Sequence, residues 1–468
     1  MMRRTRFVLL VPFVLAGCAL GPDYERPALD LPTAYVQPVE EGENFANLPW
    51  WTLFEDPRLE ELVRIALEEN QDLGIAIARI VEFRGLLGVT RADQFPTVDI
   101  VGTGAQSGLS ENSFPGNLPG GVGEGSAEIY RLSADVFFEV DLFGRLRRSP
   151  EAARGALLAV EETRRAVTIS LIASVASTYM TLRDLDQQLE IARRTVATRN
   201  DSLRIIEARF EKGTVARIDV NQAEIQLTIA EAAVAAAERQ VAQTENLLAV
   251  LLGRNPGPIT RGLALADQVA PPAIPAGLPS ELLQRRPDVL AAEAELAAQT
   301  ARIGVAEALR WPSLTLTGSL GLESNELSDL TAGGSDYWNA GVGLLAPLFN
   351  AGRNRSRVEI ERARTEQALL GYEATVLRAF REVEDALVAV RTYRDEHAAR
   401  RRQVEAARSA ATLSRARYDG GVTSYLEVLD TERSLFNAEL AESQTLRLYY
   451  TSIIELYKAL GGGWSPEG

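Results

Sequence analysis

The sequence predicts a mainly α-helical chain with a β-barrel portion, built from two similar halves. The segment Ala208–Gly213 returns as Ala416–Gly421, and a shift of 208 residues then holds without a gap, so one large structural unit is used twice. Proline is absent from 151 to 255 and from 348 to 465. Because proline breaks helix interiors, these two runs predict very long helices. Four short segments outside the runs alternate apolar and polar residues, which predicts strands.

The first 17 residues form a bacterial processing signal. Three arginines precede an apolar stretch of about ten residues, which is too short to span a bilayer as a helix. The stretch ends in Leu-Ala-Gly before Cys18, the pattern of a lipoprotein cleavage site. A thiol is the nucleophile that acyl transfer needs, and several acyl chains on one residue give a stable anchor. We therefore predict that 1–17 is removed and that Cys18 is lipidated.

The composition excludes several classes of function. The formal net charge is −15 and the pI is near 4.9, which argues against a nucleic-acid partner because such a partner would favour a basic stripe. Inside a tube, the same acidity would favour cations over anions. Cys18 and His397 are the only cysteine and histidine, so the sequence offers no metal site, no internal disulfide and no nucleophile–base pair. We expect no cofactor and no enzyme activity.

The first elements are a strap and a helix. Residues 18–57 are rich in proline and predict an extended strap rather than a domain. Residues 58–94 predict one helix, which stops before Phe95-Pro96 because the residue before a proline is pushed out of the helical region.

The strands come in two pairs, one in each half. The predicted segments are 97–106, 129–140, 313–320 and 338–344. Each has the length and the period of two that are typical of transmembrane barrel strands, and glycine-rich loops at 107–127 and 321–336 join them. Four strands are too few to close a barrel with a lumen. If they span a membrane, several protomers must share one barrel, since open sheet edges do not survive in lipid.

Each half then continues as a long helical hairpin, over 150–252 and 352–460, with Pro150 expected at the start of the first. Apolar residues recur at a spacing of seven in the first hairpin: Val175, Leu182, Leu189, Val196, Leu203 and Phe210. A strict seven-residue repeat makes helices supercoil against neighbours. In the second hairpin Glu442 and His397 interrupt the stripes, and His397 stands at the position equivalent to Leu189, where a packed side chain is expected.

The chain therefore divides into six segments, here given in order. They are a signal peptide (1–17), a strap (18–57), a first repeat (58–260), a connector (261–279), a second repeat (280–460) and a flexible tail (461–468).

Acidic residues mark the tip of the second hairpin. Glu427 and Asp430 are three residues apart and share one helix face, with Leu426 beside them. In a ring of copies they would form two stacked acidic rings with an apolar collar, and such rings are how pores select and close. Two solvated carboxylates near a helix N-terminus explain the same pattern equally well.

Motifs spread over the whole mature chain strongly resemble the TolC/OprM family of outer-membrane factors, in particular its lipoprotein branch that serves drug-efflux pumps. The motifs are Cys18–Pro27, Trp50–Pro57, Asn70–Leu73, Asp141–Gly144, Arg209–Gly213, Arg285–Val289 and Tyr418–Asp430.

The resemblance implies a homotrimer. Each protomer would give four strands to one shared twelve-stranded barrel and its helices to a periplasmic tube, which a mixed equatorial domain girdles. The tube would be a passive duct in the outer membrane of a Gram-negative bacterium, in contact with outer-membrane lipid. A periplasmic adaptor protein and an inner-membrane transporter of the RND type would supply docking and energy.

The resemblance also implies roles for residues of the hairpin tips. The residues that match the periplasmic gate are Leu426, Glu427, Asp430 and Asp219. The residues that match adaptor contacts are Gly213, Thr214, Gly421 and Val422. Thr423 stands where some members place an arginine that latches to the first hairpin, so closure is expected to rest on Leu426 packing and on Arg217 instead.

The main hypothesis is thus the exit duct of a tripartite efflux system, conducting drugs or other small molecules passively from periplasm to exterior. Two alternatives stay open. A type I secretion duct would differ only in cargo and partner. A lipid-anchored structural coiled coil without a pore would have no use for four amphipathic strands.

Overall fold

The computed structural model describes residues 19–37, 49–108, 126–271 and 279–462. The predicted lipidation site, Cys18, lies outside the described residues. The chain divides into two compact units. Unit 1 comprises 1–27, 81–158 and 293–371, and unit 2 comprises 28–80, 159–292 and 372–468. Each half of the sequence repeat therefore contributes to both units.

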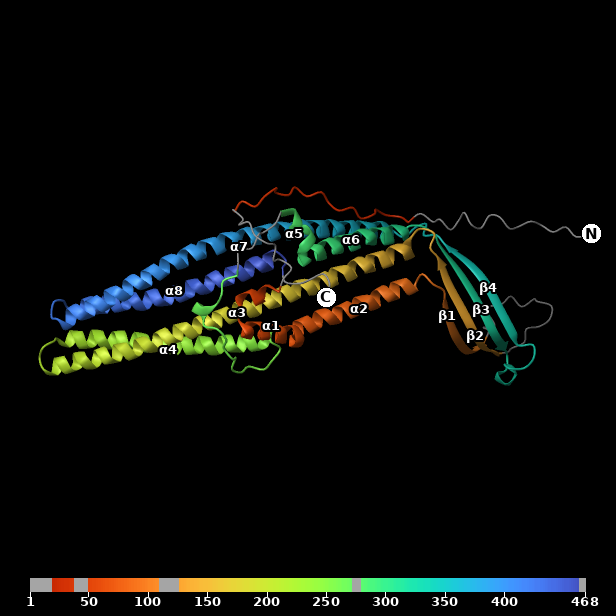
Figure 1. Cartoon of the computed structure of the whole chain (residues 1–468). Helices are drawn as coiled ribbons and strands as arrows, with labels where there is room; N and C mark the ends of the chain where they lie inside the picture. The colour runs from red at the N-terminus through yellow and green to blue at the C-terminus, as the bar shows by residue number, and fades with distance from the viewer. Residues whose placement is uncertain (1–18, 38–48, 109–125, 272–278, 463–468) are drawn as a thin grey trace, which may run out of the picture. The chain divides into compact units, whose positions relative to one another are not determined.

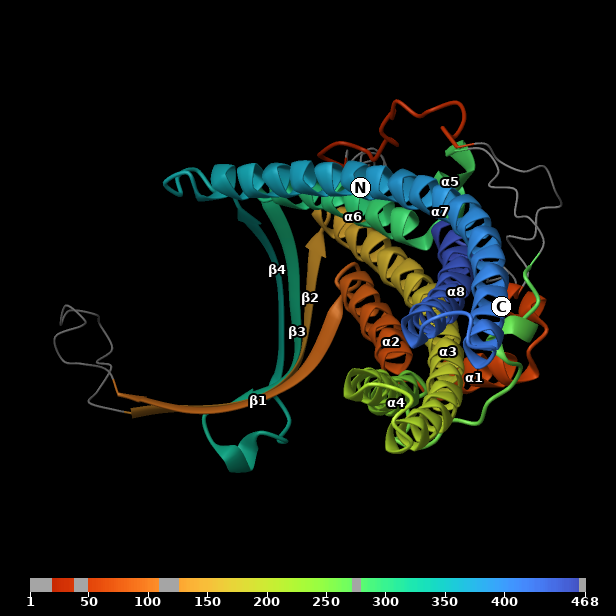
Figure 2. The ribbon, with the colours of Figure 1, turned by 90° about the vertical axis from the view of Figure 1, so that its left-hand side faces the viewer.

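Unit 1 contains one antiparallel sheet, with the strand order β1-β2-β3-β4 (Figure 2). The strands are β1 Thr97–Gly108, β2 Ser126–Val140, β3 Ser313–Ser324 and β4 Asp336–Leu345. All four predicted strands are confirmed. β3 and β4 are longer than expected because Leu322 still pairs with Asp336, inside the segment 321–336 that was predicted as a loop. The predicted loop 107–127 falls largely outside the described residues.

The two faces of this sheet differ in polarity. One register row joins Ile100, Ala134, Leu320 and Trp338, and Ile100 is 82% and Trp338 76% exposed. The neighbouring row lies on the opposite face, because successive side chains of a strand alternate. That row consists of Asp99, Asp135, Ser319 and Asn339. An exposed apolar face opposite a polar one is the pattern of a sheet between lipid and water.

The two halves contain helical hairpins of equal size (Figure 1). They are α3 Arg145–Glu211 with α4 Arg217–Leu251, and α7 Arg353–Asp419 with α8 Tyr425–Ala459. The longer helices have 67 residues each and the shorter ones 35, and every bound is displaced by 208 positions, which confirms the predicted repeat. At a rise of 1.5 Å per residue, the longer helices extend for about 100 Å.

Helix α3 begins earlier than the sequence suggested. Pro150 was expected at its start but lies inside it. Proline has no N–H group, so the carbonyl of Leu146 lacks its usual donor four residues later. The side chain of Gln94 donates to this carbonyl instead, with Nε2 2.7 Å from the oxygen. This replacement hydrogen bond lets the helix start at Arg145.

The single helix expected over 58–94 is two helices. The shorter helical elements are η1 Trp50–Phe54, α1 Pro57–Glu69, α2 Gln71–Ala92, η2 Leu265–Asp267, α5 Pro279–Arg285, α6 Pro287–Ala308 and η3 Leu327–Asp329. Asn70 separates α1 from α2. Its Oδ1 accepts from the backbone N–H of Leu73 at 3.0 Å and caps α2, while its Nδ2 donates to Leu251 O at 3.0 Å. Periodicity alone could not reveal this cap, because the apolar spacing continues through it.

The core of unit 2 is organised around a buried carboxylate. Asp56 is fully buried and caps α1 by accepting from Arg58 N at 2.9 Å. It also accepts from Tyr179 Oη at 2.8 Å and from Gln268 Nε2 at 2.7 Å. Burial, together with Asp56, raises the pKa of Tyr179, so this phenol stays protonated and keeps donating. The end of the strap, α3 and the connector are thereby joined at one residue.

The described start of the strap docks on unit 1. Leu20 donates its N–H to Phe143 O at 3.2 Å, and Arg148 donates to Asp23 at 2.7 Å. Gly144 has a φ of +82°, and a Cβ there would lie 2.6 Å from the Cα of Ala19. Only glycine permits both this left-handed backbone and this close approach. The residues that directly follow the predicted lipid anchor are therefore held at the end of β2.

Candidate functional site: the hairpin tips

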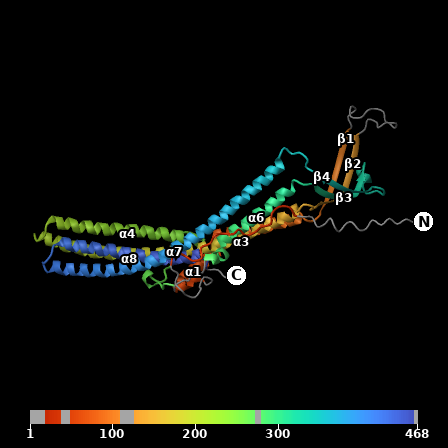
Figure 3. The same cartoon turned by 90° about the horizontal axis from the view of Figure 1, so that it is seen from above.

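The two helical hairpins of unit 2 turn at tips that face the same way (Figures 1 and 3). Gly213 and Gly421 have φ values of +70° and +74°, and nothing lies within 4 Å of a Cβ added to either. Gly213 N donates to Phe210 O at 2.8 Å, and Thr214 N donates to Arg209 O at 3.0 Å. The second tip repeats both bonds, so each long helix ends in a Schellman motif.

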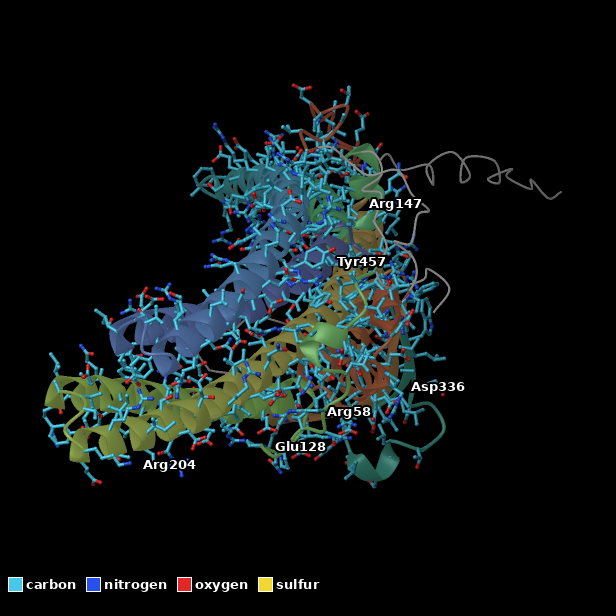
Figure 4. All side chains as sticks on the ribbon, turned by 60° about the vertical axis from the view of Figure 1, so that its left-hand side comes forward. Arg58, Glu128, Arg147, Arg204, Asp336 and Tyr457 are labelled. Atoms are coloured by element: carbon cyan, nitrogen blue, oxygen red, sulfur yellow. The ribbon has the colours of Figure 1, made fainter. Side chains whose placement is uncertain are left out.

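The tips present exposed residues to their surroundings. Gly213, Thr214 and Gly421 are exposed, and the aliphatic side chain of Val422 is 71% exposed. Charged side chains cover the flanks of both hairpins, as Arg204 on α3 illustrates (Figure 4). The structure thus brings the residues predicted to contact an adaptor to accessible positions.

A small apolar cluster joins the two tips inside one protomer. Ile206 and Val220 of the first hairpin pack with Tyr418, Tyr425 and Val428 of the second. The rings of Tyr418 and Tyr425 are 5.4 Å apart, measured between centroids. This cluster fixes which sides of the tip helices face inward.

Arg209 links the first tip to the second. Its guanidinium lies 4.8 Å from the ring centroid of Tyr418 and 3.7 Å from Asp419 Oδ1. The cation therefore comes from the first hairpin and its partners from the second. This link differs from the latch of some family members, in which an arginine of the second tip, at the position of Thr423 here, contacts the first hairpin.

Two of the predicted gate acids, Glu427 and Asp430, each have a cationic partner within their own hairpin. Glu427 lies 3.3 Å from Arg417, and its other oxygen accepts from the hydroxyl of Thr423. Asp430 lies 2.5 Å from Arg433. The sequence placed both acids on one helix face, but it did not reveal Arg417 as the partner of Glu427, because Arg417 precedes the turn. Leu426 lies beside them and is 61% exposed.

Asp219 and Arg217 have local roles in the first hairpin. The carboxylate of Asp219 accepts from Ala216 N at 3.1 Å and so satisfies a free N–H at the start of α4. Arg217 lies over the ring of Phe210, 5.5 Å from its centroid. The structure does not bring Asp219 together with Glu427 and Asp430 through any contact among the described residues.

Sequence reasoning missed a partly buried ionisable group next to the second tip. Glu432 lies 3.5 Å from Arg415, and burial raises its pKa despite this arginine and Arg199. Burial and Glu432 raise the pKa of Tyr425 to about 12, and burial lowers the pKa of Arg199. The repeat hides the feature, because Glu432 corresponds to Glu224, which is exposed.

Comparison with known proteins supplies the context for these tips. The family model described as "Outer membrane efflux protein" matches residues 62–254 and 278–462. The chain is 36% identical to the toluene efflux pump outer membrane protein TtgI of Pseudomonas putida, over 98% of this chain and 97% of that protein. It is 35% identical to the cation efflux system protein CusC of Escherichia coli, over 97% of this chain and 99% of that one.

Solved structures agree with the sequence matches. The outer-membrane channel OprN has a TM-score of 0.87 at 32% identity, with 96% of this chain and all of that chain covered. The open state of the Neisseria gonorrhoeae outer-membrane channel MtrE has a TM-score of 0.85 at 32% identity, with 95% and 98% covered. The fold and its tips are thus those of an outer-membrane channel.

The chain belongs to the outer membrane efflux protein family. It is an outer-membrane efflux channel of a tripartite pump in a Gram-negative bacterium, with long helices in the periplasm. The predicted fold class is confirmed, and the secretion-duct and pore-free alternatives do not fit. Outer-membrane factors of efflux systems are homotrimers that work with an adaptor and an inner-membrane transporter, and the family consists of channel proteins rather than enzymes.

Proposed function

We propose that the second hairpin tip is the periplasmic gate of this channel, with Leu426 as an apolar collar and with Glu427 and Asp430 as stacked acidic rings. The observation that carries the proposal is the orientation of Leu426. Its neighbours Tyr425 and Val428 are buried in the tip cluster, whereas Leu426 is 61% exposed. An aliphatic side chain held away from its own protomer is available to meet its symmetry mates at a trimer axis.

The acids give the gate its ionic character. Each has one arginine partner, so the local charge is partly balanced, but the chain as a whole carries −15. Arg417 and Glu427 belong to the same hairpin and would move together. We therefore expect cation preference to persist when the gate opens, with Asp219 adding a carboxylate from the first hairpin.

Leu426→Ala tests the collar. Removing the side chain should raise the resting conductance of the trimer in planar bilayers, because the apolar constriction widens. Leu413→Ala is a matched control, since Leu413 is also 61% exposed but lies on α7. A wild-type trace for Leu426→Ala, or an equal rise for Leu413→Ala, would remove Leu426 from the gate.

The partners follow from the tips and from the strap. Gly213, Thr214, Gly421 and Val422 would contact the periplasmic adaptor, and the pump would be of the RND type. Val422→Asp should reduce adaptor co-purification, and unchanged recovery would argue against this contact.

The strap docked at the end of β2 supports an anchor at Cys18 in outer-membrane lipid, which mass spectrometry of the mature N-terminus would test. The acidic composition supports the absence of a nucleic-acid partner.

The cargo would be drugs or other small molecules. The relatives named above serve pumps for toluene and for cations at almost equal identity. Overall similarity therefore does not select a cargo, and the transporter that loads the duct would set it.

A further inference from the structure

Unit 1 contains an open cavity that the gate does not explain. It lies between α2, α3, α6 and α7 near the strands and has a volume of about 500 Å³. Figure 2 shows these four helices next to one another beside the sheet. This volume falls within the range of pockets that hold small organic ligands.

The walls of the cavity are mostly apolar. The apolar lining residues include Phe83, Leu86, Val305 and Leu309. Alanines of α3 and α6 line the space between them, and three of these, Ala152, Ala156 and Ala306, are buried. Such walls exclude water from an apolar ligand and provide dispersion contacts, but they select no particular head group.

Two arginines that line the cavity have N–H donors that are not used in short hydrogen bonds. The contact that the structure gives Arg357 is a long one, 3.5 Å to Asn354 Oδ1, and no carboxylate of the described chain pairs with it. Arg302 lies 3.7 Å from Glu295, beyond hydrogen-bond distance. Each guanidinium has five N–H donors, so both can take up an anionic oxygen.

A third polar group at the cavity needs a donor. Arg364 donates to Oε1 of Glu361 at 2.7 Å, but Oε2 is buried and has no partner within the described structure. A buried acceptor without a donor is costly unless a ligand or a water supplies one. The lining therefore offers donors from Arg302 and Arg357 and one unused acceptor from Glu361.

We propose that this cavity binds amphipathic organic anions whose head group also carries a hydrogen-bond donor. The apolar body lies against α2 and α6, the negative oxygen accepts from Arg302 and Arg357, and the donor satisfies Glu361 Oε2. That such a ligand is exported cargo rests on the proposed function. The binding site itself does not, because binding can be measured without transport.

Two fluorescent probes separate the head group from the apolar body. 1-Anilinonaphthalene-8-sulfonate has an apolar body, an N–H donor and a sulfonate, and N-phenyl-1-naphthylamine has the same body and donor without the sulfonate. Both are titrated into the trimer in lipid nanodiscs, with empty nanodiscs as the blank. Arg302→Gln and Arg357→Gln should each raise the Kd of the sulfonate probe about ten-fold. Neither should change the Kd of the neutral probe.

A matched variant and a filled cavity complete the test. Arg355→Gln removes the same charge from α7, but Arg355 does not line the cavity and pairs with Glu359, so it should change neither Kd. Ala153→Trp should abolish binding of both probes by filling the space. The proposal would be overturned if all three arginine variants bound the sulfonate probe as tightly as the wild type. It would also be overturned if all three lost affinity for that probe by the same factor. If the protein supports export but binds neither probe, only this inference is wrong, and the proposed function stands.

Discussion

The two helical hairpins have matching backbones and different interiors. Their helices have equal lengths, and each turns at a left-handed glycine, Gly213 or Gly421. The first hairpin has the apolar residues Leu189 and Val234 midway along its helices. The second hairpin has His397 and Glu442 at the equivalent positions, and His397 Nε2 lies 2.8 Å from Glu442 Oε1. The same backbone therefore carries apolar residues in one half and a polar pair in the other.

The difference extends to the acids of the shorter helices. Glu439 of α8 is almost buried and receives Arg194 of α3 at 2.7 Å and Arg408 of α7 at 3.0 Å. Its counterpart in the first half, Glu231, is exposed. The second hairpin is thus held to its neighbours by directional ionic contacts. Such contacts specify one arrangement but can be exchanged, which suits the hairpin that we expect to move.

The largest effect is expected at Glu439. Glu439→Ala removes the shared acceptor of Arg194 and Arg408 and should lower the free energy of unfolding by about 2 kcal/mol, the worth of hydrogen bonds to a charged group. Thermal unfolding of the trimer, followed by helical circular dichroism, measures it. Glu231→Ala is the matched control and should change stability by less than about 0.5 kcal/mol, as exposed substitutions do. Equal effects at both positions would mean that the halves do not differ in this way.

A smaller effect is expected when the first hairpin's pair is placed in the second. The double substitution His397→Leu with Glu442→Val should stabilise the trimer by about 1 kcal/mol, because well-packed apolar residues that replace a partly buried polar pair no longer have to be desolvated as polar groups. Glu442→Val alone should destabilise, since His397 then loses its partner. The same unfolding measurement decides the outcome. A double variant less stable than the wild type would show that the polar pair contributes more than its apolar counterpart.

Much of this fold was predictable because its signals are periodic. The repeat of 208 positions predicted both hairpins, and alternation predicted all four strands. The errors came from single side chains that act on the backbone. Gln94 replaces the hydrogen bond lost at Pro150, and Asn70 caps a helix inside a continuous apolar pattern. Periodicity averages over many residues, so it cannot detect one such hydrogen bond.

The candidate site was less predictable for a related reason. Sequence spacing placed Glu427 and Asp430 on one face, and Arg433 pairs with Asp430 within the same helix, but the pairing of Arg417 with Glu427 depends on how the turn closes. The repeat was also misleading at one point. It aligns Glu432 with Glu224, although Glu432 is partly buried and Glu224 is exposed.

That contrast gives the smallest predicted effect. Burial raises the pKa of Glu432 above its unfolded value of 4.5, so the folded chain holds this proton more tightly. The contribution of this carboxyl to stability is full below that value and is lost as pH rises through the folded pKa. Glu432→Gln, which cannot ionise, should therefore stabilise the trimer at neutral pH by less than about 1 kcal/mol. It should also flatten the pH profile of the unfolding temperature, while Glu224→Gln leaves that profile unchanged. A loss of stability at neutral pH would instead show that the attraction between Glu432 and Arg415 outweighs burial.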